Sequence, residues 1–521
     1  MTFTNPIIAG FHPDPSICRV GQDYFLVTSS FEYFPGVPLF HSRDLVHWRQ
    51  IGHVLTRPSQ LPFAHWQPFG GIFAPTIRYH DGTFYMITTN MSGGGNFYVH
   101  TADPFGAWSD PVWVDDRGGF DPSLYFDDDG RVYLTSTETQ HFPLPDEIDP
   151  AAPFWGIQQS EIDLTTGRLL TEPRRIWAGT GGKSPEGPHL DKINGRYYLL
   201  VAEGGTEHGH MVTIARSDTP WGPWESCPHN PILTHRSFHS PFQALGHADL
   251  IEAHDGSWWL VCLGVRPQGI PPTTHLGRET FLAPVQWDDA GWPRVGQQGR
   301  LRVVMESPAF GPVSWEPQPE RDDFDGPQLG VAWNFLGTPA TNVWELSARP
   351  GALRLLGNEA RLDDGPPVAF VGRRQEHFAC EVATRLDFEP AADGEEAGLT
   401  VWMNPSHHYD LFVTRQDGQR QVTVRRRIGS LVADVARVSI EPGPITLMIQ
   451  AEQDRYTFGV SGKSGDQQIL ATGETHYLAQ EVAGLFRGVF FALYASGSGA
   501  AATAPAFFEW FDYRVAAPDS R

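Results

Sequence analysis

Short runs of aromatic and β-branched residues, bounded by turn residues, recur along the chain, whereas glycine and proline return too often for long segments of helical periodicity. Such runs are typical of an all-β protein. Five of them resemble one another: each has a turn, one spacer residue, an aromatic residue or valine, a second aromatic residue and then aliphatic residues. They are GQDYFLV from Gly21, HDGTFYMI from His80, DDGRVYLT from Asp128, INGRYYLL from Ile193 and HDGSWWLV from His254.

These repeats recur at intervals of roughly 50 to 65 residues, which is the scale of one propeller blade. A blade is a four-stranded sheet, and Asp-Gly or Asn-Gly supplies the positive φ values of a tight hairpin turn. Five copies therefore predict a five-bladed β-propeller, which we place at residues 1–305. A stacked solenoid is the alternative, but its repeats are normally shorter and more regular.

Beyond the repeats, the proline-containing stretch 306–322 has no periodicity and predicts a linker. Residues 323–521 then contain alternating runs about ten residues apart, such as FACEVATRLDF and HHYDLFVTR. This spacing favours an antiparallel β-sandwich as an accessory domain. A chain of 521 residues is also too long for one compact core, so two domains are expected.

One position is shared by the five repeats. To find it, we take the residue just before the turn glycine of each repeat, with Gln22 as its equivalent in the first repeat, and count back eight residues. The surrounding residues align with a slip of one position in the second and fourth repeats. The residues at this position are Asp14, Phe73, Asp121, Glu186 and His247. Because the first strand of each propeller blade lines the central channel, we expect three carboxylates, one imidazole and one aromatic ring to face a single cavity.

Two interpretations of this position remain open. A solvated channel rim is often polar and would explain the residues without any chemistry. Carboxylates that share a cleft, however, raise one another's pKa and leave one ionised base beside one protonated acid. Glycoside hydrolysis requires that pair. Asp14, Asp121 and Glu186 are therefore the candidate catalytic residues.

Composition narrows the possible partners and compartment. The formal net charge of −23 argues against a nucleic-acid or anionic-membrane surface, which needs clustered Lys and Arg. The first residues, MTFTNPIIAG, have neither a basic nor an apolar signal region, and no later run approaches a membrane span, so a cytoplasmic protein is expected. The cysteines have no metal or redox spacing and are expected to be buried thiols: Cys18, Cys227, Cys262 and Cys380. Abundant aromatic residues suit a ligand that stacks, such as a sugar ring.

Several stretches of residues 1–305 are similar to glycoside hydrolase family 43, in particular to its two-domain β-xylosidases and α-L-arabinofuranosidases. They are NPIIAGFHPDPSICRVGQDYFLVTSSFEYFPGVPLFHSRDLVHW, FDPSLYFDDDGRVYL, KSPEGPHL, GHADLIEAHDGSWWLVCLGVRP and LGRETFLAPVQW. The resemblance implies a five-bladed propeller, inversion of anomeric configuration and exo-attack on short pentose-containing oligosaccharides. It also makes a homo-oligomer a reasonable expectation, because dimers and tetramers are common among the proteins that the chain resembles.

The resemblance also implies roles for individual residues. Asp14 in HPDPS matches the general base that activates water, and Glu186 in SPEGPHL matches the general acid that protonates the leaving oxygen. Asp121 in FDPSL matches the residue that orients Glu186 and keeps its pKa high. Arg278 in LGRETF matches a residue that grips sugar hydroxyls and the carboxylate cluster, although an ion pair with a structural acid would also explain it.

Other positions match the substrate pocket. Thr206 in EGGTEHGH and Phe31 in SSFEYF do so, although a surface-loop threonine is an equal explanation of the first. His247 in GHADL matches a channel histidine near a bound calcium ion or its waters, although a core histidine is the alternative. The resemblance thus implies a largely water-coordinated Ca²⁺ in the channel, with His247 as its protein neighbour, and no organic cofactor.

One position departs from the family's pattern, and one further cluster is assigned no role. Phe73 in GGIFAPTI stands where the family often has tryptophan, so an apolar platform remains while the indole donor is lost and the sugar preference stays open. The cluster EHGH at 207–210 lacks the helix and the spacing of a zinc site and predicts a loop.

Three functions are compatible with these observations. They are an exo-acting pentosidase, an endo-acting arabinan hydrolase on the same propeller, and a non-catalytic sugar-binding propeller. Binding a neutral sugar gives no reason to crowd three carboxylates together, and an extra domain tends to close one side of an open cleft. The sequence therefore favours the pentosidase. It leaves open whether xylose is released from β-1,4-xylooligosaccharides, arabinose from terminal α-L-arabinofuranosyl residues, or both.

Overall fold

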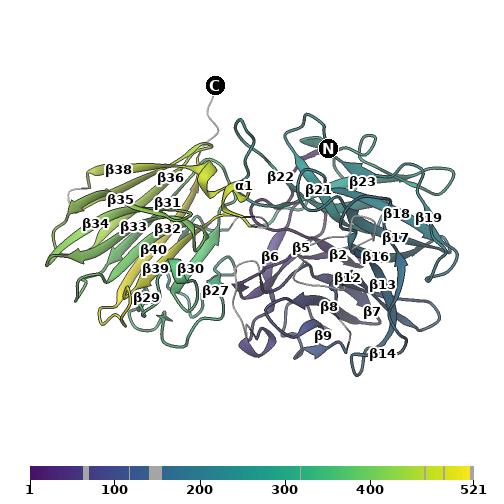
Figure 1. The fold of residues 1–521 in the computed structure, drawn as a ribbon, viewed down its shortest axis with the longest axis horizontal. Helices are drawn as coiled ribbons and strands as arrows, with labels where there is room; N and C mark the ends of the chain where they lie inside the picture. Colours follow the sequence, from purple (N-terminus) through teal and green to yellow (C-terminus); the bar gives the residue numbers. More distant parts are fainter. Residues whose placement is uncertain are drawn as a thin grey trace. The chain divides into compact units, whose positions relative to one another are not determined.

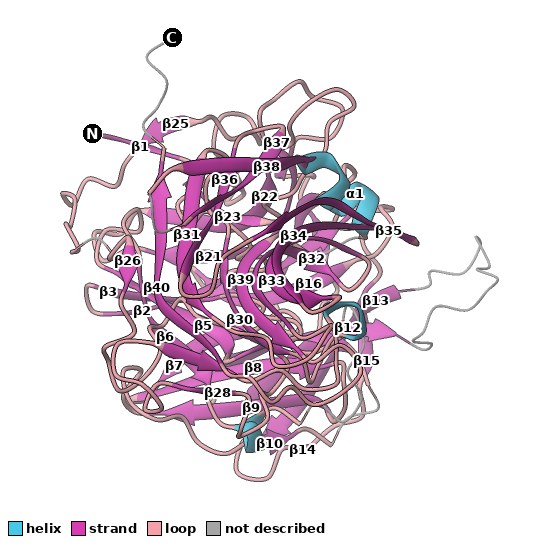
Figure 2. Cartoon of the chain, turned by 90° about the vertical axis from the view of Figure 1, so that its left-hand side faces the viewer, coloured by secondary structure: helices cyan, strands magenta, loops and turns pink. Residues whose placement is uncertain are grey.

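The computed structural model describes residues 1–62, 70–115, 118–139, 155–316, 318–462, 465–484 and 487–516. It divides the chain into two compact units, Met1–Arg266 with Arg278–Trp315 and Pro267–Gly277 with Glu316–Arg521. Strands dominate both units and the helices are short (Figure 2). The helices are α1 (Gln480–Ala483) and the 3-10 helices η1 (Pro58–Gln60), η2 (Leu362–Asp364) and η3 (Thr475–Leu478). Within the described residues, no helix is long and apolar enough to cross a membrane.

The first unit contains five antiparallel sheets that follow one another along the chain, from purple to teal in Figure 1. The first sheet contains β2 (Ser16–Val20), β3 (Asp23–Val27), β5 (Gly36–Ser42) and β6 (Arg49–Leu55). The second contains β7 (Thr76–His80), β8 (Thr83–Asn90), β9 (Gly95–Thr101) and β10 (Val112–Trp113). The third is β11 (Phe120–Phe126), β12 (Val132–Thr139), β13 (Trp155–Asp163), β14 (Arg168–Leu169) and β15 (Arg174–Trp177). The fourth contains β16 (Glu186–Ile193), β17 (Arg196–Glu203), β18 (Met211–Ser217), β19 (Glu225–Ser226) and β20 (Leu233–Thr234). The fifth contains β21 (Gln243–Glu252), β22 (Trp258–Val265), β23 (Glu279–Trp287) and β24 (Pro293–Val295).

The first strands of these sheets form a closed ring. β2 contacts β7 and β21, β7 contacts β11, β11 contacts β16, and β16 contacts β21. The N-terminal segment is tied to the fifth sheet, because the Ile7 N–H donates to the carbonyl of Thr280 in β23 at 2.9 Å. In a separate two-stranded sheet, β1 (Thr2–Thr4) pairs with β25 (Val304–Glu306). The predicted five-bladed propeller is confirmed.

Local turn chemistry explains why the five repeats form equivalent elements. Each repeat supplies the turn after the first strand and then the second strand of a blade: β3, β8, β12, β17 and β22. In the second blade, Asp81 and Gly82 have φ values of 45° and 80°, and in the fourth, Asn194 and Gly195 have 51° and 80°. Two successive positive φ values define the hairpin turn whose twist matches that of the flanking strands.

The second unit contains two antiparallel sheets, coloured green to yellow in Figure 1. One has the order β28 (Trp344–Glu345), β29 (Leu353–Leu355), β40 (Ala506–Val515), β31 (Cys380–Asp387), β36 (Ile445–Ala451), β37 (Arg455–Ser461), β38 (Gln467–Glu474), with β26 (Arg321–Asp322) beside β40. The other, called the six-stranded sheet below, has the order β30 (Ala369–Arg374), β39 (Phe490–Ser496), β32 (Glu396–Asn404), β33 (His407–Gln416), β34 (Gln419–Ile428), β35 (Leu431–Ser439). The predicted β-sandwich is confirmed. Two further strands are two residues long, β4 (Tyr33–Phe34) and β27 (Phe335–Leu336).

The structure draws the domain boundaries differently from the sequence. Part of the stretch 306–322 is not a free linker, because the Val313 N–H donates to the Asp44 carboxylate at 2.7 Å and the Trp315 indole donates to the His47 carbonyl at 2.9 Å. Residues 267–277 lie between β22 and β23 but group with the second unit. Both differences depend on contacts between distant parts of the chain, which a local pattern does not contain. The four cysteines are buried and free, as expected.

Candidate active site

The position shared by the repeats has an unusual backbone in the structure. The φ angle is positive at Asp14 (56°), Asp121 (51°) and His247 (43°), and in the fourth blade the positive value falls on Gly187 (58°), one residue after Glu186. Pairing with the second strand shifts register at this point in β11, β16 and β21. Bulges of this kind re-aim side chains, and positive φ at a non-glycine residue is a strain that gathers at functional sites. The equivalence of these positions therefore holds in the backbone of the first, third, fourth and fifth blades, including the slip in the fourth, whereas Phe73 of the second blade does not share the positive φ.

Asp14 is held by three polar neighbours. Its Oδ2 accepts a hydrogen bond from Ser29 Oγ at 2.5 Å, and its Oδ1 accepts one from Arg278 Nη1 at 2.9 Å. The Nδ1 atom of His247 lies 3.7 Å from the same Oδ1. Burial by itself raises the pKa of Asp14, but Arg278, His247 and Ser29 together bring the pKa below its ordinary value. Asp14 is therefore an ionised carboxylate at neutral pH.

Glu186 and Asp121 titrate in the opposite direction. Burial and then the charge of Asp14 raise the pKa of Glu186 to about 8. Burial and then Glu186 and Asp14 raise the pKa of Asp121 well above its ordinary value, although the backbone N–H of Gly187 donates to its carboxyl group. A protonated Glu186 thus accompanies an ionised Asp14, which is the arrangement that acid–base catalysis needs.

Two groups besides Asp121 bear on the raised pKa of Glu186. Burial and then the charge of Asp14 are its largest causes in the structure, and the role that we expected for Asp121 stays a prediction. Burial acts on both Glu186 and Asp121, and Glu186 is also a cause of the raised pKa of Asp121, so the two raised pKa values belong to the pair. The hydrogen bond from the Gly187 N–H links Asp121 to the fourth blade.

Glycine at position 187 lets two blades approach closely. A Cβ atom on Gly187 would lie 2.9 Å from Cε1 and Nε2 of His247, closer than real side-chain contacts allow. The backbone after Glu186 therefore lies directly against the imidazole of His247. This contact fixes Glu186 relative to the fifth blade, and the positive φ also favours glycine there.

The remaining predicted residues lie next to this cluster. Thr206, between β17 and β18, accepts a hydrogen bond from Arg278 Nη1 at 3.2 Å. The Arg278 guanidinium carbon lies 5.5 Å from the ring centroid of Phe31, whose ring in turn lies 5.3 Å from that of Phe73. The structure thus brings together all eight predicted site residues, with the charged groups contiguous and two phenyl rings beside them. Thr206 is part of the site rather than a surface-loop residue.

Sequence reasoning missed two residues of the site. Ser29, which follows β3, is one, because a serine after a strand carries no signal of its own. His210, in the segment predicted as a loop, is the other: it is buried, its Nδ1 lies 3.0 Å from the Ala244 carbonyl, and burial lowers its pKa to about 3. A Cβ atom on Gly246 would lie 2.3 Å from its ring, so His210 packs on the backbone that leads to His247.

A second polar layer joins four blades near the site. Arg78 Nη1 donates to Asp249 Oδ2 at 2.8 Å, and Arg78 Nη2 lies 2.8 Å from His189 Nδ1. Ser16 Oγ also donates to Asp249 Oδ2, at 2.7 Å. Although burial opposes it, Arg78 lowers the pKa of Asp249 to about 2. These residues come from β2, β7, β16 and β21, so the network holds the first strands together. The sequence does not reveal it, because each residue is a single polar position inside a strand.

The side chains around His247 bear on how the expected calcium ion would be held. Among the described residues, no group of three or more His, Cys, Asp and Glu side chains could hold a metal ion. A cation beside His247 would therefore take most of its ligands from water, as Ca²⁺ can do.

Both units of the chain are similar to known proteins. Residues 3–293 match the family described as glycosyl hydrolases family 43, and residues 321–514 match the beta xylosidase C-terminal concanavalin A-like domain. A non-reducing end alpha-L-arabinofuranosidase of Bacteroides ovatus is 46% identical, covering 98% of this chain and 95% of its own. A xylosidase/arabinosidase of Butyrivibrio fibrisolvens is 40% identical, with 95% and 96% covered. The solved structure of the Bacteroides ovatus xyloglucan PUL GH43B protein superposes with a TM-score of 0.92 at 45% identity, over 99% of this chain and 100% of that chain.

Proposed function

This chain belongs to glycosyl hydrolases family 43, and on that premise we propose that it releases single pentoses from the non-reducing ends of oligosaccharides. Its substrates are β-1,4-xylooligosaccharides and oligosaccharides with terminal α-L-arabinofuranosyl residues. Relatives named as an arabinofuranosidase and as a xylosidase/arabinosidase support this substrate class. The observation that carries the proposal is an ionised Asp14 in the same cluster as a protonated Glu186.

In the proposed mechanism, Asp14 takes a proton from a water molecule while the water oxygen attacks the anomeric carbon. At the same time Glu186 donates its proton to the glycosidic oxygen, the bond from that oxygen to the anomeric carbon breaks, and the leaving alcohol departs neutral. Because the water attacks the face opposite the leaving group, the anomeric configuration inverts. Proton exchange with solvent then returns Asp14 to its ionised form and Glu186 to its protonated form.

The neighbouring residues prepare this pair. Arg278 holds Asp14 in its ionised form and, with Thr206, presents donors toward sugar hydroxyls. Phe31 and Phe73 offer apolar ring faces on which a sugar ring stacks. Asp121 positions the start of β16 through its hydrogen bond from Gly187, and thereby positions Glu186.

Four substrates test the proposal. The enzyme should hydrolyse a nitrophenyl β-xyloside and a nitrophenyl α-arabinofuranoside, release xylose from xylobiose, and make no internal cuts in linear arabinan. Proton NMR during the first minutes should show α-xylose as the product formed first from a β-xyloside. Internal cleavage of arabinan would contradict exo-action, and β-xylose as the first product would contradict inversion.

The pH dependence should follow the two carboxyl groups. Glu186 acts in its protonated form, so kcat/KM for xylobiose should fall as pH rises through about 8. Asp14 acts ionised and its pKa is lowered, so activity should decline on the acid side only below the usual titration range of an aspartate. A pH–rate profile from pH 3 to 10 measures both limbs. A basic limb centred near the ordinary pKa of glutamate would contradict the assignment.

We also propose that a largely water-coordinated calcium ion lies beside His247 and supports the arrangement of the charged site. Dialysis against a chelator should then lower kcat/KM severalfold, and Ca²⁺ should restore it while Na⁺ does not. Because the ion would have few protein ligands, its affinity should be weak, in the range of about 10⁻⁴ to 10⁻³ M. Full activity in a metal-free sample, checked by elemental analysis, would remove the ion from the mechanism.

A further inference from the structure

The six-stranded sheet of the second unit carries a polar cavity of about 750 Å³ on one face. Successive side chains of β33 point to opposite faces of the sheet, so Leu411 and Val413 lie on one face. His408, Asp410 and Thr414 lie on the other face. The polar face of an antiparallel sheet is usually open to solvent. Here His408 and Asp410 are each only 1% exposed. The polar face is therefore the floor of a cavity.

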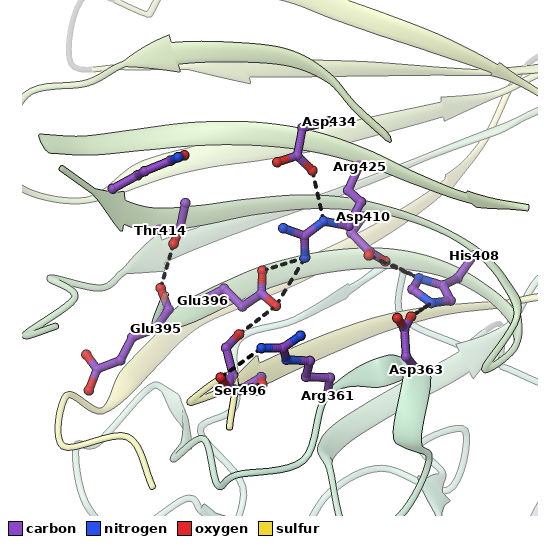
Figure 3. A network of polar contacts seen from close by, with 12 residues as sticks. Arg361, Asp363, Glu395, Glu396, His408, Asp410, Thr414, Arg425, Asp434 and Ser496 are labelled. Carbon is purple, nitrogen blue, oxygen red and sulfur yellow. Dashed lines mark hydrogen bonds and ion pairs between the residues drawn. The ribbon is translucent and has the colours of Figure 1, made fainter. Parts of the chain in front are cut away.

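Ion pairs fix the side chains around this cavity (Figure 3). The Arg425 guanidinium lies between two carboxylates, with Nε donating to Asp434 at 2.9 Å and Nη1 donating to Glu396 at 3.0 Å. Arg437 donates to the other oxygen of Asp434 at 2.6 Å. The donors and acceptors are thus held in fixed directions before any ligand arrives.

His408 forms a second fixed group in the cavity. Its Nδ1 lies 2.9 Å from Asp410 and its Nε2 lies 2.9 Å from Asp363 of η2 (Figure 3). Although burial opposes it, the pull of Asp410 and Asp363 raises the pKa of His408 to about 9. The imidazole is therefore a cation with both N–H groups directed at carboxylates.

Hydroxyl groups on the same face remain unsatisfied. Among the described residues, the hydroxyls of Thr400, Thr423 and Tyr494 are buried without a hydrogen-bond partner. Thr423 lines the cavity and is 1% exposed. Thr400 lies opposite Asp410 in the strand register, on the same face of the sheet. Because an unpaired buried hydroxyl destabilises the fold, the Thr423 hydroxyl in the lining indicates a polar ligand that completes it.

The charges of the cavity identify the class of ligand. The lining contains five cations, Arg361, His408, Arg415, Arg425 and Arg437, and five anions, Asp363, Asp393, Glu396, Asp410 and Asp434. A phosphate ligand would need an excess of cations, and a divalent metal would need carboxylates that are not paired with arginine or histidine. A sugar hydroxyl can donate to a carboxylate and accept from a guanidinium at once.

We propose that this cavity is a second, non-catalytic binding site for a neutral oligosaccharide of about two or three sugar units. The site is defined by the fixed charged groups and the unsatisfied Thr423 hydroxyl, and it uses residues of the second unit alone. The choice of a pentose oligosaccharide as its ligand rests on the proposed function.

Calorimetric titration of the full chain with thio-linked xylotriose, which is not hydrolysed, tests the site. Two sites per chain are expected. Arg437→Ala removes one guanidinium of the lining, and Thr423→Val removes the unpaired hydroxyl at nearly constant volume. Each should weaken one of the two sites about tenfold, leaving the other site and the hydrolysis of nitrophenyl β-xyloside unchanged. Thr446→Val, at a partly buried position on β36 of the other sheet, is the matched control and should leave both sites unaltered.

The outcomes separate this site from the proposed function. A single site that neither cavity variant weakens, in variants whose thermal unfolding matches the wild type, would overturn the proposal. Binding of inorganic phosphate that Arg437→Ala abolishes, with no response to the sugar, would overturn the ligand class. If the wild type hydrolyses neither pentoside but binds the probe at a site that Arg437→Ala weakens, the proposed function is wrong and the cavity assignment stands.

Discussion

Asp14→Ala should lower kcat/KM by about 10²- to 10⁴-fold on both xylobiose and nitrophenyl β-xyloside, the range typical of losing a general base. Both substrates need an activated water, so a better leaving group cannot compensate. The variant also leaves the buried Arg278 without the carboxylate that accepts its hydrogen bond at 2.9 Å. Steady-state kinetics on the two substrates measure the loss.

Added azide provides a control for this variant. Azide attacks without deprotonation, so it should restore cleavage of the nitrophenyl substrate by Asp14→Ala and yield an inverted glycosyl azide. Ser29→Ala removes only the hydrogen bond to Asp14 Oδ2 and should cost far less activity. If Asp14→Ala spares either substrate, Asp14 is not the base.

Glu186→Ala should separate the two substrates. Xylobiose has a poor leaving alcohol that needs a proton, so kcat/KM should fall about 10²- to 10⁴-fold. Nitrophenolate leaves without a proton, so the nitrophenyl xyloside should lose far less. The fall in activity above pH 8 should disappear with it, because that limb reports the pKa of Glu186. Kinetics on both substrates across this pH range test the assignment.

The matched control is Glu207→Ala. Glu207 is a nearby carboxylate that pairs with Lys183 at 2.8 Å and contributes to the raised pKa of Glu186. Its removal should shift the basic limb slightly downward and keep both substrates active. An equal loss on both substrates in Glu186→Ala would contradict its role as the acid.

The sequence by itself determined the all-β architecture, the five blades and the alignment of the acids. These features depend on local rules: paired positive φ values at Asp81-Gly82 and Asn194-Gly195, and the two-residue period of a strand. Five copies of one pattern then place Asp14, Asp121 and Glu186 at equivalent positions without knowledge of any contact. The resemblance to a family added roles to residues that the repeat had already singled out.

Only the tertiary structure decided which acid is ionised. Asp14 owes its lowered pKa to Arg278, which is 264 residues away in the chain, and Glu186 owes its raised pKa to burial beside Asp14. The Arg78–Asp249 layer and the cavity around Arg425 were likewise invisible in the sequence, since their members are isolated polar residues on different strands. The physical reason is that local turns and strands follow from neighbouring residues, whereas charge pairing and desolvation depend on groups that meet only after folding.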